Sequence, residues 1–309
     1  MRESIFEETA KGKVSRHVLL TILLALILLF TADFLTYIII ELIISLDFWK
    51  LEWDSDIVQL IILLATSIST VMLFMWVKFK EKRPISSLGL FKEGALTELS
   101  RGWLVGSVLF GACLILTIIS GSGVIETVRF TADKLIWFLI FAVGWQVQSA
   151  SVEILCRGWL LPVSATKYSK IVSVSISSIF FGLLHSANNH VSLISIFNLC
   201  LFGLFLSLYV ILKGNIWGAC GIHGAWNCVQ GSVFGIEVSG EPMLSNSLVH
   251  VKTYGADWIS GGKFGVEGSM ITSIVLIVAC YWLYQNRIFL TTNRFNLNKL
   301  LLLKAYFLF

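Results

Sequence analysis

The stretch SVEILCRGWLLP, residues 151–162, places a carboxylate and a guanidinium four residues apart within a run of apolar side chains. On a helix, Glu153 and Arg157 would lie side by side, because residues at i and i+4 are neighbours. A charge taken out of water is costly unless it is paired, so we expect the two side chains to form a structural ion pair. At about 100° per residue, Gln146 falls on the same face, which indicates a polar stripe along an otherwise apolar helix.

The rest of the chain is also strongly apolar. Its 309 residues are 56% hydrophobic and only 14% charged, whereas a soluble domain carries roughly 25% charged residues. Several apolar runs are long enough to cross a bilayer core, which takes about 20 helical residues. These features indicate a polytopic membrane protein whose first partner is the lipid bilayer. No basic patch interleaved with aromatic residues favours nucleic-acid binding.

Eight apolar segments predict an all-α membrane helix bundle of about eight transmembrane spans, in one integral membrane domain over residues 1–309. If both termini are cytoplasmic, most of the 23 Lys and Arg residues lie on the cytoplasmic side, in agreement with the positive-inside rule. Short connectors suit a bacterial plasma membrane, so we expect an integral plasma membrane protein with cytoplasmic N- and C-termini. The predicted spans are 18–45, 57–77, 103–121, 135–162, 171–189, 191–212, 216–235 and 270–286.

Two segments outside the spans carry further expectations. Residues 236–269 are predicted to form an extracytoplasmic loop, which is rich in glycine and long enough to fold over an opening. The tail 297–309, LNKLLLLKAYFLF, is apolar but too short to span, and we expect it to lie in the membrane interface. The six cysteines all fall in predicted spans without metal-type spacing, so we interpret them as small buried hydrophobes.

Two further predicted spans carry polar groups. His223 and Asn227 share one face of the helix predicted for GIHGAWNCVQG, and His185 follows the apolar run FFGLL. Strongly polar side chains in membrane helices usually face a bundle interior or a water-filled cavity, where they suggest a functional site. We therefore expect the polar groups of the three spans to share one cavity. Taken alone, each histidine can instead serve as a hydrogen bond between helices.

Together these residues resemble the CPBP family, the type II CAAX prenyl protease and bacteriocin-processing group of intramembrane peptidases. That family is marked by the ordered motifs Glu-Glu-x-x-x-Arg, Phe-x-x-x-His and His-x-x-x-Asn. The resemblance covers about residues 80–235, which we expect to form a protease-like core. The matching residues, motif by motif, are Glu153 and Arg157 in VEILCR, Phe181 and His185 in FGLLH, and His223 and Asn227 in HGAWN.

The resemblance implies a glutamic-type intramembrane endopeptidase that acts on membrane-associated peptides or lipidated proteins. In such a site a carboxylate and a histidine hold and deprotonate a water molecule, which attacks a peptide carbonyl. Glu153 and His185 would take these roles in this chain. His223 and Asn227 would stabilise the oxyanion. The supporting residues would be Arg157, Gln146 and Phe181.

One position departs from the family motif. The family usually has two adjacent glutamates, and the role of base is generally assigned to the first, which is Val152 here. Since valine cannot accept a proton, two interpretations stay open. Either Glu153 serves as the base after a modest rotation of its helix, or the chain is a catalytically impaired member that works as a membrane binding or bacteriocin-immunity-type protein.

Two other classes of function are compatible with some of these residues. Glu153, His185 and His223 are ligand types that permit zinc, with an open fourth position. The sequence has no His-Glu-x-x-His or other close ligand spacing, so we expect no metal cofactor and keep zinc as an alternative. A transporter is the other alternative, but neither an inverted repeat nor a pair of broken helices is visible in the sequence.

Overall fold

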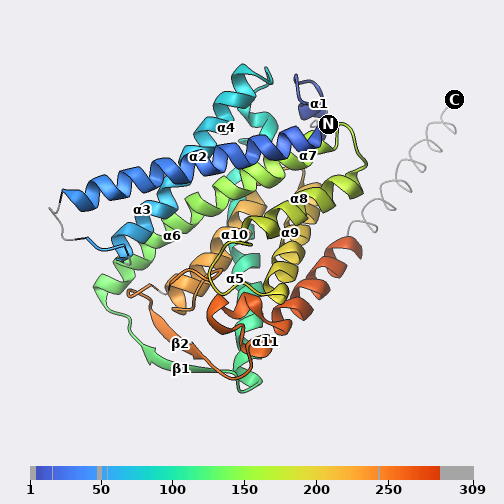
Figure 1. Cartoon of the computed structure of the whole chain (residues 1–309). Coiled ribbons are helices and arrows are strands. Elements are labelled where there is room, and N and C mark those ends of the chain that lie inside the picture. Colours follow the sequence, from blue (N-terminus) through green and yellow to red (C-terminus); the bar gives the residue numbers. More distant parts are fainter. Residues whose placement is uncertain (1–4, 16, 47–50, 54, 243, 286–309) are drawn as a thin grey trace.

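The computed structural model describes residues 5–15, 17–46, 51–53, 55–242 and 244–285, and these are mostly helical (Figure 1). The predicted interfacial tail 297–309 lies outside the described residues. In chain order the elements are α1 (Ile5–Ala10), α2 (Val18–Ser45), α3 (Asp56–Ala65), α4 (Ser67–Phe79), the 3-10 turn η1 (Ile85–Leu88), α5 (Ala95–Ile119), β1 (Gly123–Val128), α6 (Ala132–Glu153), the π-helical segment η2 (Ile154–Leu160), α7 (Leu161–Ser164), α8 (Lys170–Leu184), α9 (Leu193–Lys213), α10 (Trp217–Cys228), the π-helical segment η3 (Val229–Val233), β2 (Val249–Thr253), α11 (Asp257–Ser260), the 3-10 turns η4 (Gly262–Phe264) and η5 (Val266–Gly268), and a last helix Met270–Gln285.

The apolar segments of the sequence form the expected membrane bundle. Each of the eight predicted spans contains a helix, which confirms a helical integral membrane protein. Large apolar side chains such as Phe34, Leu104 and Leu139 are exposed on the outer faces, as a surface in contact with lipid requires. The number of spans and the side of the termini stay predictions. The five helical segments long and apolar enough to cross a membrane, within the described chain, are Val18–Ser45, Asp56–Phe79, Ala95–Ile119, Ala132–Ser164 and Leu193–Lys213.

Helix α10 lies at the centre of the bundle, and its residues 218–228 are all buried. Glycines let its backbone touch that of α5. A Cβ atom on Gly221 would lie 2.3 Å from the carbonyl oxygen of Leu99, and one on Gly106 would lie 2.2 Å from that of Ile222. Small residues at such spacing are typical of close helix packing in membranes. The main apolar core lies around this contact, between α5, η2, α8, α9 and α10.

The described chain is mostly helical, as predicted, but it also contains a two-stranded antiparallel sheet that the sequence did not indicate. β1 and β2 pair from Gly123 with Thr253 to Val128 with Val249. Figure 1 shows the sheet at the end of the bundle where α6 begins. Both strands are rich in β-branched residues, which favour extended structure. Short strands of this kind form only when tertiary contacts bring two distant loops together, so the helical periodicity of the chain did not indicate them.

The predicted loop 236–269 folds back onto the helices. Asn198 of α9 donates a hydrogen bond from Nδ2 to the carbonyl oxygen of Glu267 at 2.8 Å. Asn188, after α8, donates from Nδ2 to the carbonyl oxygen of Ser239 at 2.8 Å. Polar side chains of the bundle therefore fasten the loop over its interior.

The connector between α4 and α5 contains a buried ion pair. Arg83 Nε donates to Glu81 Oε2 at 2.7 Å, and the two residues are 4% and 2% exposed. Trp159 of η2 donates from Nε1 to the other oxygen, Glu81 Oε1, at 2.7 Å. Arg83 Nη1 donates to the hydroxyls of Ser87 at 2.8 Å and Thr9 at 3.1 Å. The pair thus joins the connector to η2 and to the first helix.

Candidate active site

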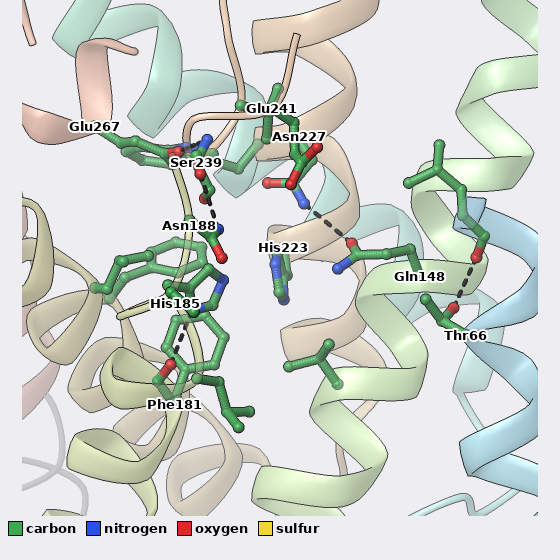
Figure 2. Close-up of a pocket in the computed structure, with 18 of the residues that line it drawn as sticks. Thr66, Gln148, Phe181, His185, Asn188, His223, Asn227, Ser239, Glu241 and Glu267 are labelled. Carbon is green, nitrogen blue, oxygen red and sulfur yellow. Dashed lines mark hydrogen bonds between the residues drawn. The ribbon is translucent and has the colours of Figure 1, made fainter. Parts of the chain in front are cut away.

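A cavity of about 640 Å³ lies between α2, α3, α6, α8, α9, α10 and the loop 236–269. His185, His223 and Asn227 line it, so polar groups from two of the three motif segments meet in one space, whereas the sequence predicted that all three would. Figure 2 shows His185 and His223 on opposite sides of this space, with Asn227 farther along α10. Segments far apart in the chain therefore combine into one polar site.

Glu153 and Arg157 form the expected ion pair. Arg157 Nη1 donates to Glu153 Oε1 at 2.9 Å, and both side chains are fully buried. The guanidinium carbon of Arg157 also lies 4.5 Å from the centre of the Phe181 ring, a favourable cation–π contact. Arg157 belongs to the π-helical segment η2, a local widening of the helix that is frequent at functional sites.

The same carboxylate holds one of the histidines. His223 Nδ1 lies 2.9 Å from Glu153 Oε1, and because an ionised carboxylate only accepts hydrogen bonds, Nδ1 is the donor. This bond fixes the imidazole ring. Glu153 and Arg157 are absent from the described residues that line the cavity, so the ion pair lies behind His223 instead of facing the cavity.

The polar stripe of α6 faces α10 and not the cavity, which corrects our expectation for this helix. Gln146 accepts a hydrogen bond from Trp103 Nε1 at 2.7 Å and donates to the carbonyl oxygen of Cys220 at 3.2 Å. Polar side chains in a membrane helix gain most where a neighbouring helix satisfies them, and α10 is that neighbour. The cavity receives the adjacent face of α6. The α6 residues on that face are Trp145, Gln148 and Val152.

His185 directly follows the last residue of α8. Its Nδ1 lies 2.9 Å from the carbonyl oxygen of Phe181, which can only accept, so Nδ1 is the donor and Nε2 of the neutral ring is an acceptor. The Phe181 ring packs against both imidazoles, with centroid distances of 5.0 Å to His185 and 5.6 Å to His223. Phe181 therefore acts as a spacer that sets the distance between the two histidines.

Asn227 of α10 is oriented by the neighbouring helix α6. Its Nδ2 donates to Gln148 Oε1 at 3.2 Å and to Ser149 Oγ at 3.4 Å. The motifs did not indicate Gln148, although it is a polar residue on the face of α6 next to the stripe. Its role became visible only once the orientation of α6 was known.

The loop contributes three polar cavity residues that the motifs did not indicate, namely Ser239, Glu241 and Glu267. Glu267 is 6% exposed. It accepts from Trp226 Nε1 at 3.3 Å and from the backbone N–H of Ser239. Burial raises the pKa of Glu267 to about 7, although these hydrogen bonds oppose the shift. No short motif marks a glutamate of this kind, because it reaches the site through the folding of a long loop.

The ligand types proposed for zinc do not gather as a metal site. In the described part of the chain, no three His, Cys, Asp or Glu side chains lie close enough together to hold a metal ion. Glu153 is engaged by His223, and the Nδ1 atom of His185 is engaged by a backbone carbonyl. The geometry therefore gives the zinc alternative no support.

The fold and the site define a helical integral membrane protein with a cavity that is lined by apolar residues and by polar side chains from several segments. Residues 133–229 match the family model described as type II CAAX prenyl endopeptidase Rce1-like. Over residues 133–229, this match confirms the resemblance to the CPBP family drawn from the three motifs. The segment runs from the start of α6 to just beyond α10, so it contains all three motifs and excludes the loop 236–269. A comparison with curated proteins found no match.

Proposed function

We propose that this protein is an intramembrane endopeptidase of CAAX-protease type, which cleaves membrane-associated peptides or lipidated proteins. The observation that carries the proposal is the single cavity lined by His185, His223 and Asn227. A histidine with a free ring nitrogen can hold a water molecule by accepting a hydrogen bond from it. Oriented donors stabilise the oxyanion that forms when water attacks a carbonyl. The family match supports this class of chemistry.

Within this proposal the residues have separate tasks. His185, whose Nδ1–H is held by a backbone carbonyl, presents Nε2 to the attacking water. His223, protonated on both ring nitrogens, donates from Nε2 to the carbonyl oxygen of the substrate while its Nδ1–H stays on Glu153. Asn227 contributes the N–H that it otherwise gives to Ser149 at 3.4 Å. Glu153, paired with Arg157, holds the ring of His223 in place. For Glu153 to act as the proton-accepting base itself, α6 would have to rotate until the carboxylate leaves both partners.

The apolar wall of the cavity supports a hydrophobic substrate. On this side α2 and α3 present aliphatic and aromatic side chains, which favour an apolar peptide segment or a lipid chain. The outer face of α2 is itself apolar, with Phe34 63% exposed, so this wall of the cavity belongs to a helix suited to contact with lipid. The apolar lining residues of α2 and α3 are Leu26, Leu29, Phe30, Ile62 and Leu63.

The membrane arrangement is part of the proposal. Eight spans in one membrane domain, with both termini on the cytoplasmic side of a plasma membrane, account for the distribution of Lys and Arg. The loop 236–269 is then extracytoplasmic and covers the outer end of the cavity.

A second candidate function is favoured by one observation. Val152 lines the cavity where the family usually has its first glutamate. A chain without hydrolysis would use the same cavity to bind a membrane peptide, as a binding or bacteriocin-immunity-type protein.

The test compares new peptide termini in membranes from cells that make the native chain, His185→Ala or His223→Ala at matched protein levels. Discrete termini are expected with the native chain, and their loss is expected in both variants. His250→Ala is the matched control, because it removes a histidine of β2 that lies outside this cavity. Its termini should match those of the native chain.

The same experiment separates the two candidates. If the native chain and His223→Ala give the same termini, the endopeptidase proposal is wrong. The appearance of new termini in Val152→Glu alone would then support a family member that has lost hydrolysis and kept the binding cavity.

A further inference from the structure

The cavity wall formed by α6 lacks an acidic side chain. Val152 lines the cavity, whereas Glu153 is fully buried against Arg157 and His223. Water that attacks a peptide bond needs a proton acceptor, and a carboxylate is a common one. If the chain hydrolyses peptides, a carboxylate that takes this proton has to come from another element.

Three acidic residues line the cavity in the described part of the chain: Asp33, Glu241 and Glu267. Asp33 of α2 and Glu241 of the loop are exposed. Glu267 differs from them, since only 6% of its surface is exposed. A poorly hydrated carboxylate holds a proton more tightly than a hydrated one, so Glu267 is the strongest candidate for a proton acceptor.

Glu267 is held by neutral groups. Trp226 Nε1 donates to Oε2 at 3.3 Å, and the backbone N–H of Ser239 donates to Oε1. Among the described residues, no Lys, Arg or His pairs with this carboxylate. A buried carboxylate without a cation is costly to maintain. Its pKa of about 7 lets it take up and release a proton near neutrality.

Both donors connect Glu267 to the motif-bearing segments. Trp226 belongs to α10, the helix of the third motif. Ser239 accepts a hydrogen bond through its carbonyl oxygen from Asn188 Nδ2 at 2.8 Å, and Asn188 lies three residues beyond His185. Figure 2 shows this series of residues running along one wall of the cavity, from Glu267 to His185. The loop glutamate is therefore fixed to the same framework as the histidines.

We propose that Glu267 supplies, from the loop before the last helix, the proton-accepting carboxylate that the site lacks at Val152. The inference rests on the proposed function. Glu267 takes a proton from water as the water oxygen bonds to the peptide carbonyl carbon, and His223 and Asn227 hold the resulting oxyanion. The C–N bond then breaks, and the proton passes from Glu267 to the nitrogen of the leaving amine.

A purely structural Glu267 would only fasten the loop. Glutamine has nearly the same shape and keeps an oxygen that can accept the N–H of Ser239, so Glu267→Gln removes the proton acceptor and retains this contact. Glu237→Gln is the matched control, because it makes the same change in the same loop at a side chain outside the cavity. Glu241→Gln tests the second acidic residue of the loop that lines the cavity.

The experiment uses the full-length protein in vesicles of membrane lipids, with a synthetic peptide that spans the most abundant cleavage site found for the native chain. Glu267→Gln is expected to slow hydrolysis by at least about 100-fold, the usual contribution of a general base. Its melting temperature should be unchanged or higher. Glu237→Gln should keep the native rate. Val152→Glu, added to Glu267→Gln, is expected to restore at least about one tenth of that rate by supplying a carboxylate on α6.

The pH profile separates a catalytic from a structural Glu267. The rate of hydrolysis by the native chain should rise with pH through about 7, where the carboxyl group of Glu267 loses its proton. In the variant with both Val152→Glu and Glu267→Gln, this rise should occur at a different pH. A native rate in Glu267→Gln overturns the inference and leaves the proposed function standing. Loss of hydrolysis in Glu241→Gln alone overturns it as well. Absence of cleavage by the native chain overturns both the inference and the proposed function.

Discussion

Two buried Glu–Arg pairs are attached to the π-helical segment η2, and they differ in what else they bind. In the connector, each oxygen of Glu81 has its own partner, Arg83 on one side and Trp159 on the other. In the site, one oxygen of Glu153 serves both Arg157 and His223. The other oxygen, Oε2, has no hydrogen-bond partner among the described residues.

Because of this difference, the pair of Glu81 and Arg83 only joins segments of the fold, whereas the pair of Glu153 and Arg157 also positions a side chain of the site. The connector pair joins three segments of backbone and touches no residue of the cavity. The pair at the site shares its acceptor with a histidine that lines the cavity, so any movement of the carboxylate moves that ring. The two ion pairs are similarly buried but serve different purposes. The group that binds the glutamate besides the arginine decides the purpose: Trp159 in the connector and His223 in the site.

The largest expected effect tests this comparison directly. Arg157→Ala and Arg83→Ala each leave a buried glutamate without its cation, so each should lower the free energy of unfolding by about 3–5 kcal/mol. Only Arg157→Ala should also abolish cleavage per folded molecule, because Glu153 no longer holds His223 in place. Thermal unfolding in detergent and cleavage assays on the folded fraction measure the two effects. Equal loss of cleavage in both variants would break the distinction.

A smaller effect is expected for the neutral partner of the connector pair. Trp159→Phe removes the hydrogen bond to Glu81 Oε1 and keeps most of the aromatic volume, so stability should fall by about 1.5–3 kcal/mol. The rate of cleavage per folded molecule should not change. A changed rate at unchanged substrate affinity would show that the connector pair also reaches the site.

The position of His223 also depends on the contact of α10 with α5. Gly221→Val inserts a side chain where a Cβ would already lie 2.3 Å from the carbonyl oxygen of Leu99. Overpacking of this kind costs about 1–3 kcal/mol and should displace α10. Gly111→Val on α5 is the control, because a Cβ there meets nothing within 4 Å. Equal melting temperatures in the two variants would contradict the packing argument.

The smallest effect concerns the buried carboxylate that has no cation. The pKa of Glu267 is raised from 4.5 to about 7 in the folded protein, so folding favours the protonated form. Its stabilising contribution is complete below about pH 4.5 and is lost as the pH rises to about 7. Glu267→Gln should therefore increase stability at pH 8 by about 1–3 kcal/mol and change it little at pH 4. Melting curves at both pH values measure this, and a destabilised variant at pH 8 would contradict it.

Much of the fold was predictable because it depends on local properties. Apolar segment length identified the helices of the bundle, and the i, i+4 spacing identified the pair of Glu153 and Arg157. The two histidines and Asn227 were identified by motif spacing, and the structure brings them into one cavity. The catalytic roles assigned to them stay predictions, as do the number of spans and the membrane orientation.

The remaining features depended on packing between distant segments. Periodicity placed Gln146 and Glu153 on one face of α6, but it did not show that this face meets α10. The structure turns Val152 and Gln148 toward the cavity instead. The loop glutamate, Glu267, was not predictable because no periodic pattern governs how a long loop returns to the bundle.

The sequence by itself determined a polytopic helical membrane protein, the family of its three motifs, and the side chains with which a site could be built. These follow from hydrophobicity and from the fixed geometry of a helix turn, both of which act over short stretches of chain. Only the tertiary structure decided which face of each helix meets the cavity, and that Glu267 reaches it. The physical reason is that close glycine contacts and buried hydrogen bonds join segments far apart in the chain, and these set the rotation of each helix and the path of the loop.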